Sequence, residues 1–255
     1  MTIAKLYGRS EAWILGFGGI LALLLVWQLV SMLVTDSVLI GNPLQVAHAS
    51  VKEFQSGRLL SDSLVSLSEL LPGFGLAMLV GVPVGLAMGR YRLVDYSLDP
   101  FLWFFYSAPI IAFYPILIMW LGLGKTTIIA LTFLFGVFPI VANTIVGVKD
   151  VDQSLIRAAR SFGANELQIF VQVILPAAVP AIAAGLRLGF GRALIGTVVG
   201  EFFGTNAGLG FRIATYGTEM RVSEMFVPVI AVMVIGISIL QLIHWLESAV
   251  ESWRP

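Results

Sequence analysis

The sequence contains no cysteine, only two histidines and few charged residues. Without cysteine, the 255-residue chain forms neither disulfides nor thiolate metal sites. Because His48 and His244 stand alone, a metal or catalytic centre would have to rest on carboxylates. Charged residues make up 12% of the chain, against roughly 25% in an ordinary soluble domain. Fifteen basic residues balance fifteen acidic ones, so the composition predicts neither a soluble domain nor a nucleic-acid-binding protein.

Apolar sequence is abundant instead, at 58% of the chain. It falls into six runs, each able to cross a hydrocarbon core of about 30 Å as a helix. The first run is too long for the apolar core of a signal peptide, so we interpret it as an uncleaved helix. We therefore predict an all-α polytopic membrane protein, with a single transmembrane domain over residues 1–255. The six predicted runs are 13–34, 62–88, 101–121, 127–147, 177–200 and 226–246.

Basic residues predict the orientation of these helices. Six spans place both termini on one side of the membrane. With the N-terminus inside, eight basic residues fall in inner segments and five in outer ones, so both termini are predicted to be cytoplasmic. Residues 42–57 have the pattern of a short amphipathic helix on the outer side. That helix would either lie on the membrane surface or pack on neighbouring loops.

The longest charged stretch on the cytoplasmic side, residues 148–176, has the signals of a helical hairpin. Asp152 is suited to cap a first helix, and Gly163 suits the left-handed position that ends it. Asn165 and Gln168 then form a capping box that starts a second helix. Two adjacent alanines leave the first helix slim, which indicates a docking element.

This hairpin resembles the EAA loop of permease subunits in binding-protein-dependent ABC importers. The family pattern is Glu-Ala-Ala, three residues, glycine, nine residues, isoleucine, one residue and Leu-Pro. The spacing here matches throughout, with arginine in place of the glutamate and Val173 in place of the isoleucine. The residues that the resemblance assigns to coupling with an ATPase are Arg157, Ala158, Ala159, Gly163, Leu175 and Pro176.

The resemblance extends over most of the chain from about residue 38 onward. It is strongest to the branch of the family that imports sulfonates, taurine, nitrate and pyrimidine precursors. One departure is Glu69, where that branch more often has arginine. The other matching segments are Gly73-Phe74, Gly85, Asp99-Pro100, Trp120 to Gly124 and Gly185 to Arg187.

The resemblance implies an ABC importer permease fold in a bacterial inner membrane. Its substrate would be a small anionic solute such as a sulfonate, taurine or nitrate. The implied partners are cytoplasmic ABC ATPase subunits, an extracytoplasmic solute-binding protein and a second permease copy, as a homodimer. The chain itself would be no enzyme and would hold no cofactor or metal, because ATP and Mg belong to the ATPase. The loop 151–176 would couple the permease to the ATPase.

Other functional classes fit the residues less well. Gly122 to Thr127 looks like the end of a phosphate-binding loop, but Met119 stands where the first glycine is needed. An intramembrane protease would need a serine facing histidine in a glycine-rich setting, and neither Ser107 nor Ser238 has one. A secondary transporter or channel stays open as the alternative, although it does not explain the hairpin.

Polar residues within the predicted spans are candidates for the translocation pathway. A charge near the bilayer centre costs roughly 2.5–3.5 kcal/mol, so Arg187 and Arg192 are expected to face a cavity or a partner. Arg187 and Glu201 lie within about 40° of one helix face but about 21 Å apart. Arg187 could instead snorkel to the interface, and the aromatic candidates could serve core packing. The full candidate set is Tyr106, Ser107, Tyr114, Asn143, Arg187, Arg192 and Glu201.

Glycine and proline predict how the spans pack. Glycines recur every fourth residue over 81–89 and in the fifth run, which favours close packing within the bundle or across a dimer interface. Pro109 and Pro115 predict a kink in the third run.

Overall fold

The computed structural model describes residues 18–19, 21–33 and 41–251, in which every regular element is a helix. The all-α prediction is therefore confirmed. A helix over Leu21–Leu33 comes first. The following elements are α3 (Pro43–Gln55), α4 (Arg58–Arg90), α5 (Arg92–Ser107), η1 (Ile110–Phe113), α6 (Tyr114–Leu121), α7 (Lys125–Lys149), α8 (Gln153–Ser161), α9 (Glu166–Ile169), η2 (Phe170–Ile174), α10 (Leu175–Gly204), α11 (Leu209–Thr218) and α12 (Val222–Glu251).

Four helices of the described chain are long and apolar enough to cross a membrane. They correspond to the second, fourth, fifth and sixth predicted runs. The first run, 13–34, lies partly outside the described residues, which include only its helix Leu21–Leu33. The four candidate spans are Arg58–Arg90, Lys125–Lys149, Glu166–Gly204 and Val222–Ser248.

The third predicted run, 101–121, is divided in the structure: its start is wrong, whereas the kink predicted at Pro109 is confirmed. Its proposed start, Asp99-Pro100, lies inside α5, where an Asp99 carboxylate oxygen accepts a hydrogen bond from the Trp103 indole at 3.0 Å. The chain then turns by 95° between α5 and the η1–α6 segment. The turn lies at Pro109, because a proline disfavours helical geometry in the residue before it, and Ala108 is extended. Pro115 does not kink a helix, since it occupies the tolerated first turn of α6.

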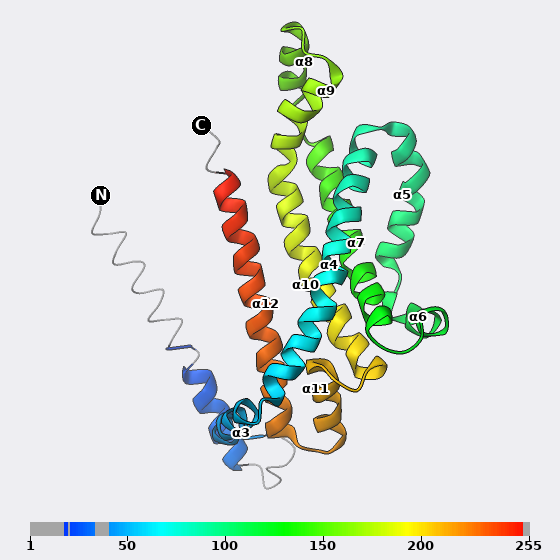
Figure 1. The fold of residues 1–255 in the computed structure, drawn as a ribbon. Helices are drawn as coiled ribbons and strands as arrows, with labels where there is room; N and C mark the ends of the chain where they lie inside the picture. Colours follow the sequence, from blue (N-terminus) through cyan, green and yellow to red (C-terminus); the bar gives the residue numbers. More distant parts are fainter. Residues whose placement is uncertain (1–17, 20, 34–40, 252–255) are drawn as a thin grey trace, which may run out of the picture.

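The centre of the molecule is α7, which packs most extensively against α4 and α10 (Figure 1). Small residues make this close approach possible. A Cβ on Gly85 of α4 would lie 2.5 Å from Cβ of Thr144, and one on Gly189 of α10 would lie 2.6 Å from the Ile140 side chain. The glycine pattern thus predicted correctly that the second and fifth runs pack inside the bundle.

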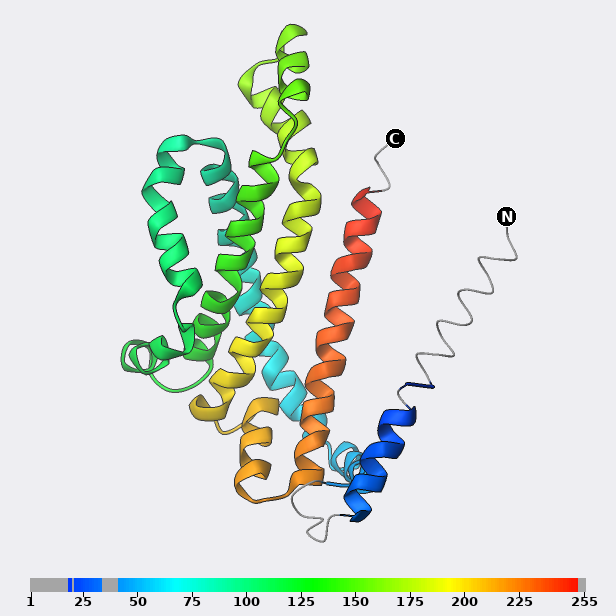
Figure 2. The same cartoon turned by 180° about the vertical axis from the view of Figure 1, so that it is seen from behind.

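The two ends of the bundle carry different elements. The hairpin α8–α9 stands at one end and α3 and α11 at the other, as both views show (Figures 1 and 2). The helix α3 fills the predicted segment 42–57, and Asn42 caps it by accepting a hydrogen bond from the Leu44 N–H at 2.8 Å. It packs against α12, where the Ser223 hydroxyl donates to Gln45 Oε1 at 2.9 Å. The apolar face predicted for α3 nevertheless stays exposed, at 66% for Leu44, 57% for Val51 and 70% for Phe54, so this contact does not decide between the two alternatives.

Candidate functional site

The hairpin forms from the capping signals that the sequence contains. An Asp152 carboxylate oxygen accepts a hydrogen bond from the Ser154 N–H at 2.7 Å, and this bond lowers the pKa of Asp152. Gly163 has a φ of +81°, so the turn uses the left-handed backbone that glycine allows. Asn165 and Gln168 exchange side-chain and backbone hydrogen bonds at 2.9 and 2.8 Å. The predicted helix–turn–helix is therefore confirmed as a structure.

The hairpin has its own small core and is continuous with a membrane span. Ile169, Ile174 and Ala178 form this core together with Val148 and Val151. The second arm continues without a break through a wider π-type turn into α10, so Glu166–Gly204 is one helix. A displacement of the hairpin is therefore applied directly to α10.

Ion pairs attach the hairpin to the inner ends of other helices. Glu166 binds Arg160 of the first arm at 2.8 Å, and it also binds Arg90 at the end of α4. Close by, the Lys149 ammonium lies 2.6 Å from an Asp95 carboxylate oxygen, which joins α7 to α5. The hairpin is thus connected to α4 as well as to α10.

One side of the hairpin is apolar and exposed. Phe162 at the tip is 91% exposed and Leu155 is 52% exposed, with Ala158 between them on the same side of the helix. Ala159 instead packs against the hairpin core. We name Leu155, Ala158 and Phe162 the apolar hairpin face. Sequence reasoning missed Phe162, although a large apolar residue in a charged loop is a usable signal.

The remaining coupling candidates take different positions. Arg157 is exposed on α8, and Leu175 is half-buried where α10 begins. Pro176 is exposed directly after the π-type turn, inside the continuous helix Glu166–Gly204. The motif thus combines exposed residues with residues that build the hairpin.

The polar side chains of the pathway candidates in the third and fourth runs mainly donate hydrogen bonds to backbone carbonyls. Ser107 donates to the Phe104 carbonyl at 3.1 Å, and the Asn143 amide donates to the Pro139 carbonyl at 2.9 Å. Tyr114 is buried, and its hydroxyl donates to the Gly200 carbonyl at 2.9 Å. The candidate with the most open aromatic ring, 38% exposed, is Tyr106.

The three charged candidates on α10 separate into three environments. Arg187 forms an ion pair with Glu247 of α12, whose side chain is 8% exposed. Arg192 is exposed and has no ion pair within the described ranges. Glu201 is buried near the C-terminal end of α10, whereas Arg187 lies near its middle. The structure therefore gives Arg187 a partner that spacing on a single helix could not reveal.

A polar network at the outer end of the bundle was missed by sequence reasoning. Asp62, Ser66 and Glu69 share one buried face of α4. The N-terminus of α11 meets this face: the Gly208 N–H donates to Asp62 at 3.3 Å and the Leu209 N–H to Ser66 at 2.9 Å. The sequence signal for this buried face was the spacing of Asp62, Ser66 and Glu69, which are four and three residues apart in an apolar run.

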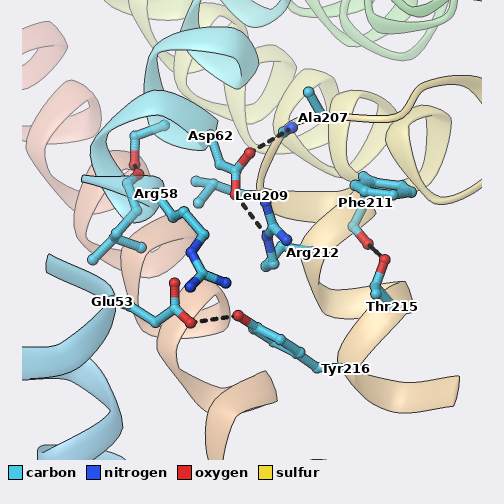
Figure 3. Close-up of polar contacts among 12 residues, drawn as sticks. Glu53, Arg58, Asp62, Ala207, Leu209, Phe211, Arg212, Thr215 and Tyr216 are labelled. Carbon is cyan, nitrogen blue, oxygen red and sulfur yellow. Dashed lines mark hydrogen bonds and ion pairs between the residues drawn. The ribbon is translucent and has the colours of Figure 1, made fainter. Parts of the chain in front are cut away.

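The same network holds the rest of α11 (Figure 3). Arg212 donates from Nε to Asp62 at 2.7 Å, and this bond raises the pKa of Arg212. Near the other end, the Tyr216 hydroxyl donates to Glu53 of α3 at 2.5 Å. Burial and that hydrogen bond raise the pKa of Tyr216 to about 12. The helix α11 is thus fastened to both α4 and α3.

Comparison with known proteins gives consistent matches. Residues 76–252 match the family described as binding-protein-dependent transport system inner membrane component. The taurine transport system permease protein TauC of Escherichia coli K12 is 33% identical, over 98% of this chain and 96% of TauC. SsuC of Bacillus subtilis 168, named for aliphatic sulfonates transport, is 29% identical, over 99% of this chain and 92% of SsuC.

A solved structure shares the fold. The MetNI methionine ABC transporter, in inward facing conformations, superposes with a TM-score of 0.64 at 20% identity. The match covers 73% of this chain and 93% of the MetNI chain.

Proposed function

We propose a coupling mechanism from one premise: the chain belongs to the family of binding-protein-dependent transport system inner membrane components. It is the permease subunit of an ABC importer, and ATP hydrolysis belongs to a separate subunit. This membership decides against the secondary transporter or channel that the apolar runs alone allowed. Within that function, the hairpin of residues 148–176 is the element that docks on the ATPase.

The observation that carries this proposal is the apolar hairpin face. Leu155, Ala158 and Phe162 stand exposed together on one side of the hairpin, and such a patch is typical of an interaction site. A groove on the ATPase would bury Phe162 as the anchor, with Ala158 allowing close approach. Arg157 would then lie at the polar rim. Gly163, Leu175 and Pro176 would hold the hairpin in shape.

Two rigid connections support a route from the ATPase into the membrane. Closure of the ATPases around ATP and Mg would displace the hairpin. The continuous helix Glu166–Gly204 would carry that displacement into α10, and Glu166 would carry it through Arg90 into α4. Since α7 packs between these helices, the central bundle would move with them and alternate between inward and outward access.

The substrate class follows from the relatives. TauC and SsuC are named for taurine and aliphatic sulfonates, so we propose that this importer takes a small anionic solute of the sulfonate type. A solute-binding protein would deliver it at the outer side of a bacterial inner membrane. Two copies of the chain would enclose the pathway. Tyr106, Ser107 and Arg192 keep exposed side chains and are the pathway candidates we retain for that interface.

Replacement of Phe162 tests the docking. Burying a phenylalanine side chain contributes about 1.5–3 kcal/mol, so Phe162→Ala should weaken ATPase binding by roughly tenfold or more. Co-purification of the ATPase with a tagged permease, followed by titration of its binding, measures the effect. Phe203→Ala is the matched control, because Phe203 is 69% exposed at the outer end of α10. Unchanged ATPase affinity in Phe162→Ala would contradict the docking site.

A further inference from the structure

Two buried carboxyl groups from different helices meet near the outer end of the bundle. Glu69 of α4 is 2% exposed and Glu201 of α10 is 0% exposed, and their carboxyl groups lie close enough to share a hydrogen bond once one of them is protonated. One oxygen of each group, Oε2 of Glu69 and Oε1 of Glu201, is buried without a partner among the described residues. A hydrogen bond between two carboxyl groups requires a proton on one of them.

The surroundings close the pair off from water. The Gly210 N–H donates to Glu201 Oε2 at 2.6 Å, and the Ser66 hydroxyl also contacts Glu201. The backbone before α11 lies directly over the same carboxyl group. A Cβ on Gly208 would come within 2.4 Å of Glu201 Oε1, so only glycine fits there. The carboxyl pair therefore occupies a tight enclosure made by three helices.

No cation forms an ion pair with either carboxyl group among the described residues. Lys125 of α7 attracts the charge of Glu69 only from beyond ion-pair distance, and Arg212 of α11 is bound to Asp62. The negative charge of Asp62 adds to the field at Glu201. The hydroxyl of Tyr114 on α6 faces Glu69 but donates to the Gly200 carbonyl. Two ionised carboxylates this close together, both buried away from bulk solvent, would repel each other strongly.

We propose that Glu69 and Glu201 form a proton-binding site whose shared proton keeps α11 closed over the outer ends of α4 and α10. The protonated carboxyl donates to its ionised neighbour, and the second Glu201 oxygen holds the N-terminus of α11. Loss of the proton places two negative charges in contact and separates α10 from α4. Because Glu201 binds Gly210, this separation releases α11. The outer opening therefore responds to external pH, independently of ATPase docking.

A distance measurement tests this site in the assembled transporter. The chain has no cysteine, so Leu64→Cys and Thr218→Cys, both at exposed positions, introduce the only two labelling sites of each copy in a cysteine-free ATPase background. Diluting the labelled permease with excess unlabelled chain isolates the distance within one copy. Electron–electron distances are recorded without nucleotide in lipid nanodiscs, from about pH 5 to about pH 9. In the otherwise unmodified chain, the distance between the labels on α4 and α11 should be short at low pH and longer at high pH.

Glu69→Gln separates this proposal from a general effect of pH. Glutamine keeps a donor for Glu201 but cannot lose a proton, so the labelled variant should stay at the closed distance across the range. Glu219→Gln, which changes an exposed outer carboxylate, should retain the full pH response. A pH-independent distance without the Glu69 change, or the same response in Glu69→Gln, would overturn the proposal.

Infrared spectroscopy gives a second measurement that needs no labels. The C=O stretch of a protonated carboxyl should be present at neutral pH and absent from Glu69→Gln and from Glu201→Gln. If neither variant assembles, the pH dependence of the label distance in the unmodified chain and in Glu219→Gln still tests the site, because both should show the longer distance at high pH. Absence of the protonated carboxyl band would count against the site.

Discussion

At the scale of single residues, glycines set how closely the central helices approach. Gly85 of α4 faces α7, where an added Cβ would lie 2.5 Å from Cβ of Thr144 and 2.9 Å from the Val141 carbonyl oxygen. Those contacts leave no room for even one methyl group. Gly75, on the same helix, has no atom within 4 Å of the corresponding position. The same substitution is therefore expected to act in opposite directions at the two sites.

We predict that Gly85→Ala lowers the stability of the permease by about 1–3 kcal/mol, because overpacking forces α4 away from α7. Gly75→Ala should be neutral or slightly stabilising, since alanine is the better helix former. Thermal unfolding of the detergent-solubilised permease measures both. Equal melting temperatures for the two variants would contradict the packing account.

Tyr216 gives a pH-dependent prediction. Its pKa is raised to about 12, from about 10 in an unfolded chain, so the folded protein holds the phenolic proton more tightly. The stabilisation is complete below about pH 10 and falls as pH rises toward about 12. Unfolding curves at increasing pH should show this decline, and Tyr216→Phe should remove it. At neutral pH, Tyr216→Phe should cost about 1–3 kcal/mol, because Glu53 loses its buried donor.

At the scale of elements, the hairpin has parts that form from local sequence signals and parts that depend on tertiary contacts. Its caps and its glycine turn involve neighbours in sequence, so they were predictable from residues such as Asp152 and Gly163. The attachment through Glu166 to Arg90 joins residues far apart in the chain and was not predictable. The error in the third span has a related cause. Asp99-Pro100 is a valid local start signal, but the helix already begins at Arg92.

The Glu166 attachment predicts a coupling defect. Exposed ion pairs contribute little stability, so Glu166→Gln should leave folding and ATPase binding nearly unchanged. ATP-driven uptake into liposomes should fall roughly fivefold or more, because the hairpin loses its connection to α4. The exchange of charges in Arg90→Glu with Glu166→Arg should restore part of the uptake. Glu219→Gln, in an exposed pair on the outer side, is the control.

At the scale of the whole molecule, the charge distribution and the placement of the hairpin agree. The hairpin end of the bundle carries Arg90, Lys149 and Arg160, as the positive-inside rule requires of a cytoplasmic end. The opposite end carries α3 and α11 (Figures 1 and 2). The molecule therefore has a defined inner and outer end.

This orientation is testable with single cysteines in a chain that contains none. Gln153→Cys, at the start of α8, should resist a membrane-impermeant maleimide in intact cells and react after permeabilisation. Thr218→Cys, at the end of α11, should react in both. Both positions are exposed, so accessibility within the fold does not confound the comparison. Labelling of Gln153→Cys in intact cells would reverse the assigned orientation.

The membrane class, four of the spans, the hairpin and the family were predictable from the amino-acid sequence, because each depends on composition or on residues close along the chain. The tertiary structure decided what brings distant segments together: the 95° turn after α5, the Arg187–Glu247 pair, the apolar hairpin face and the network around α11. Glu69 and Glu201 show the reason most clearly. Each is an ordinary acid in its own helix, and only the packing of α4, α10 and α11 removes water from both and makes them share one enclosure.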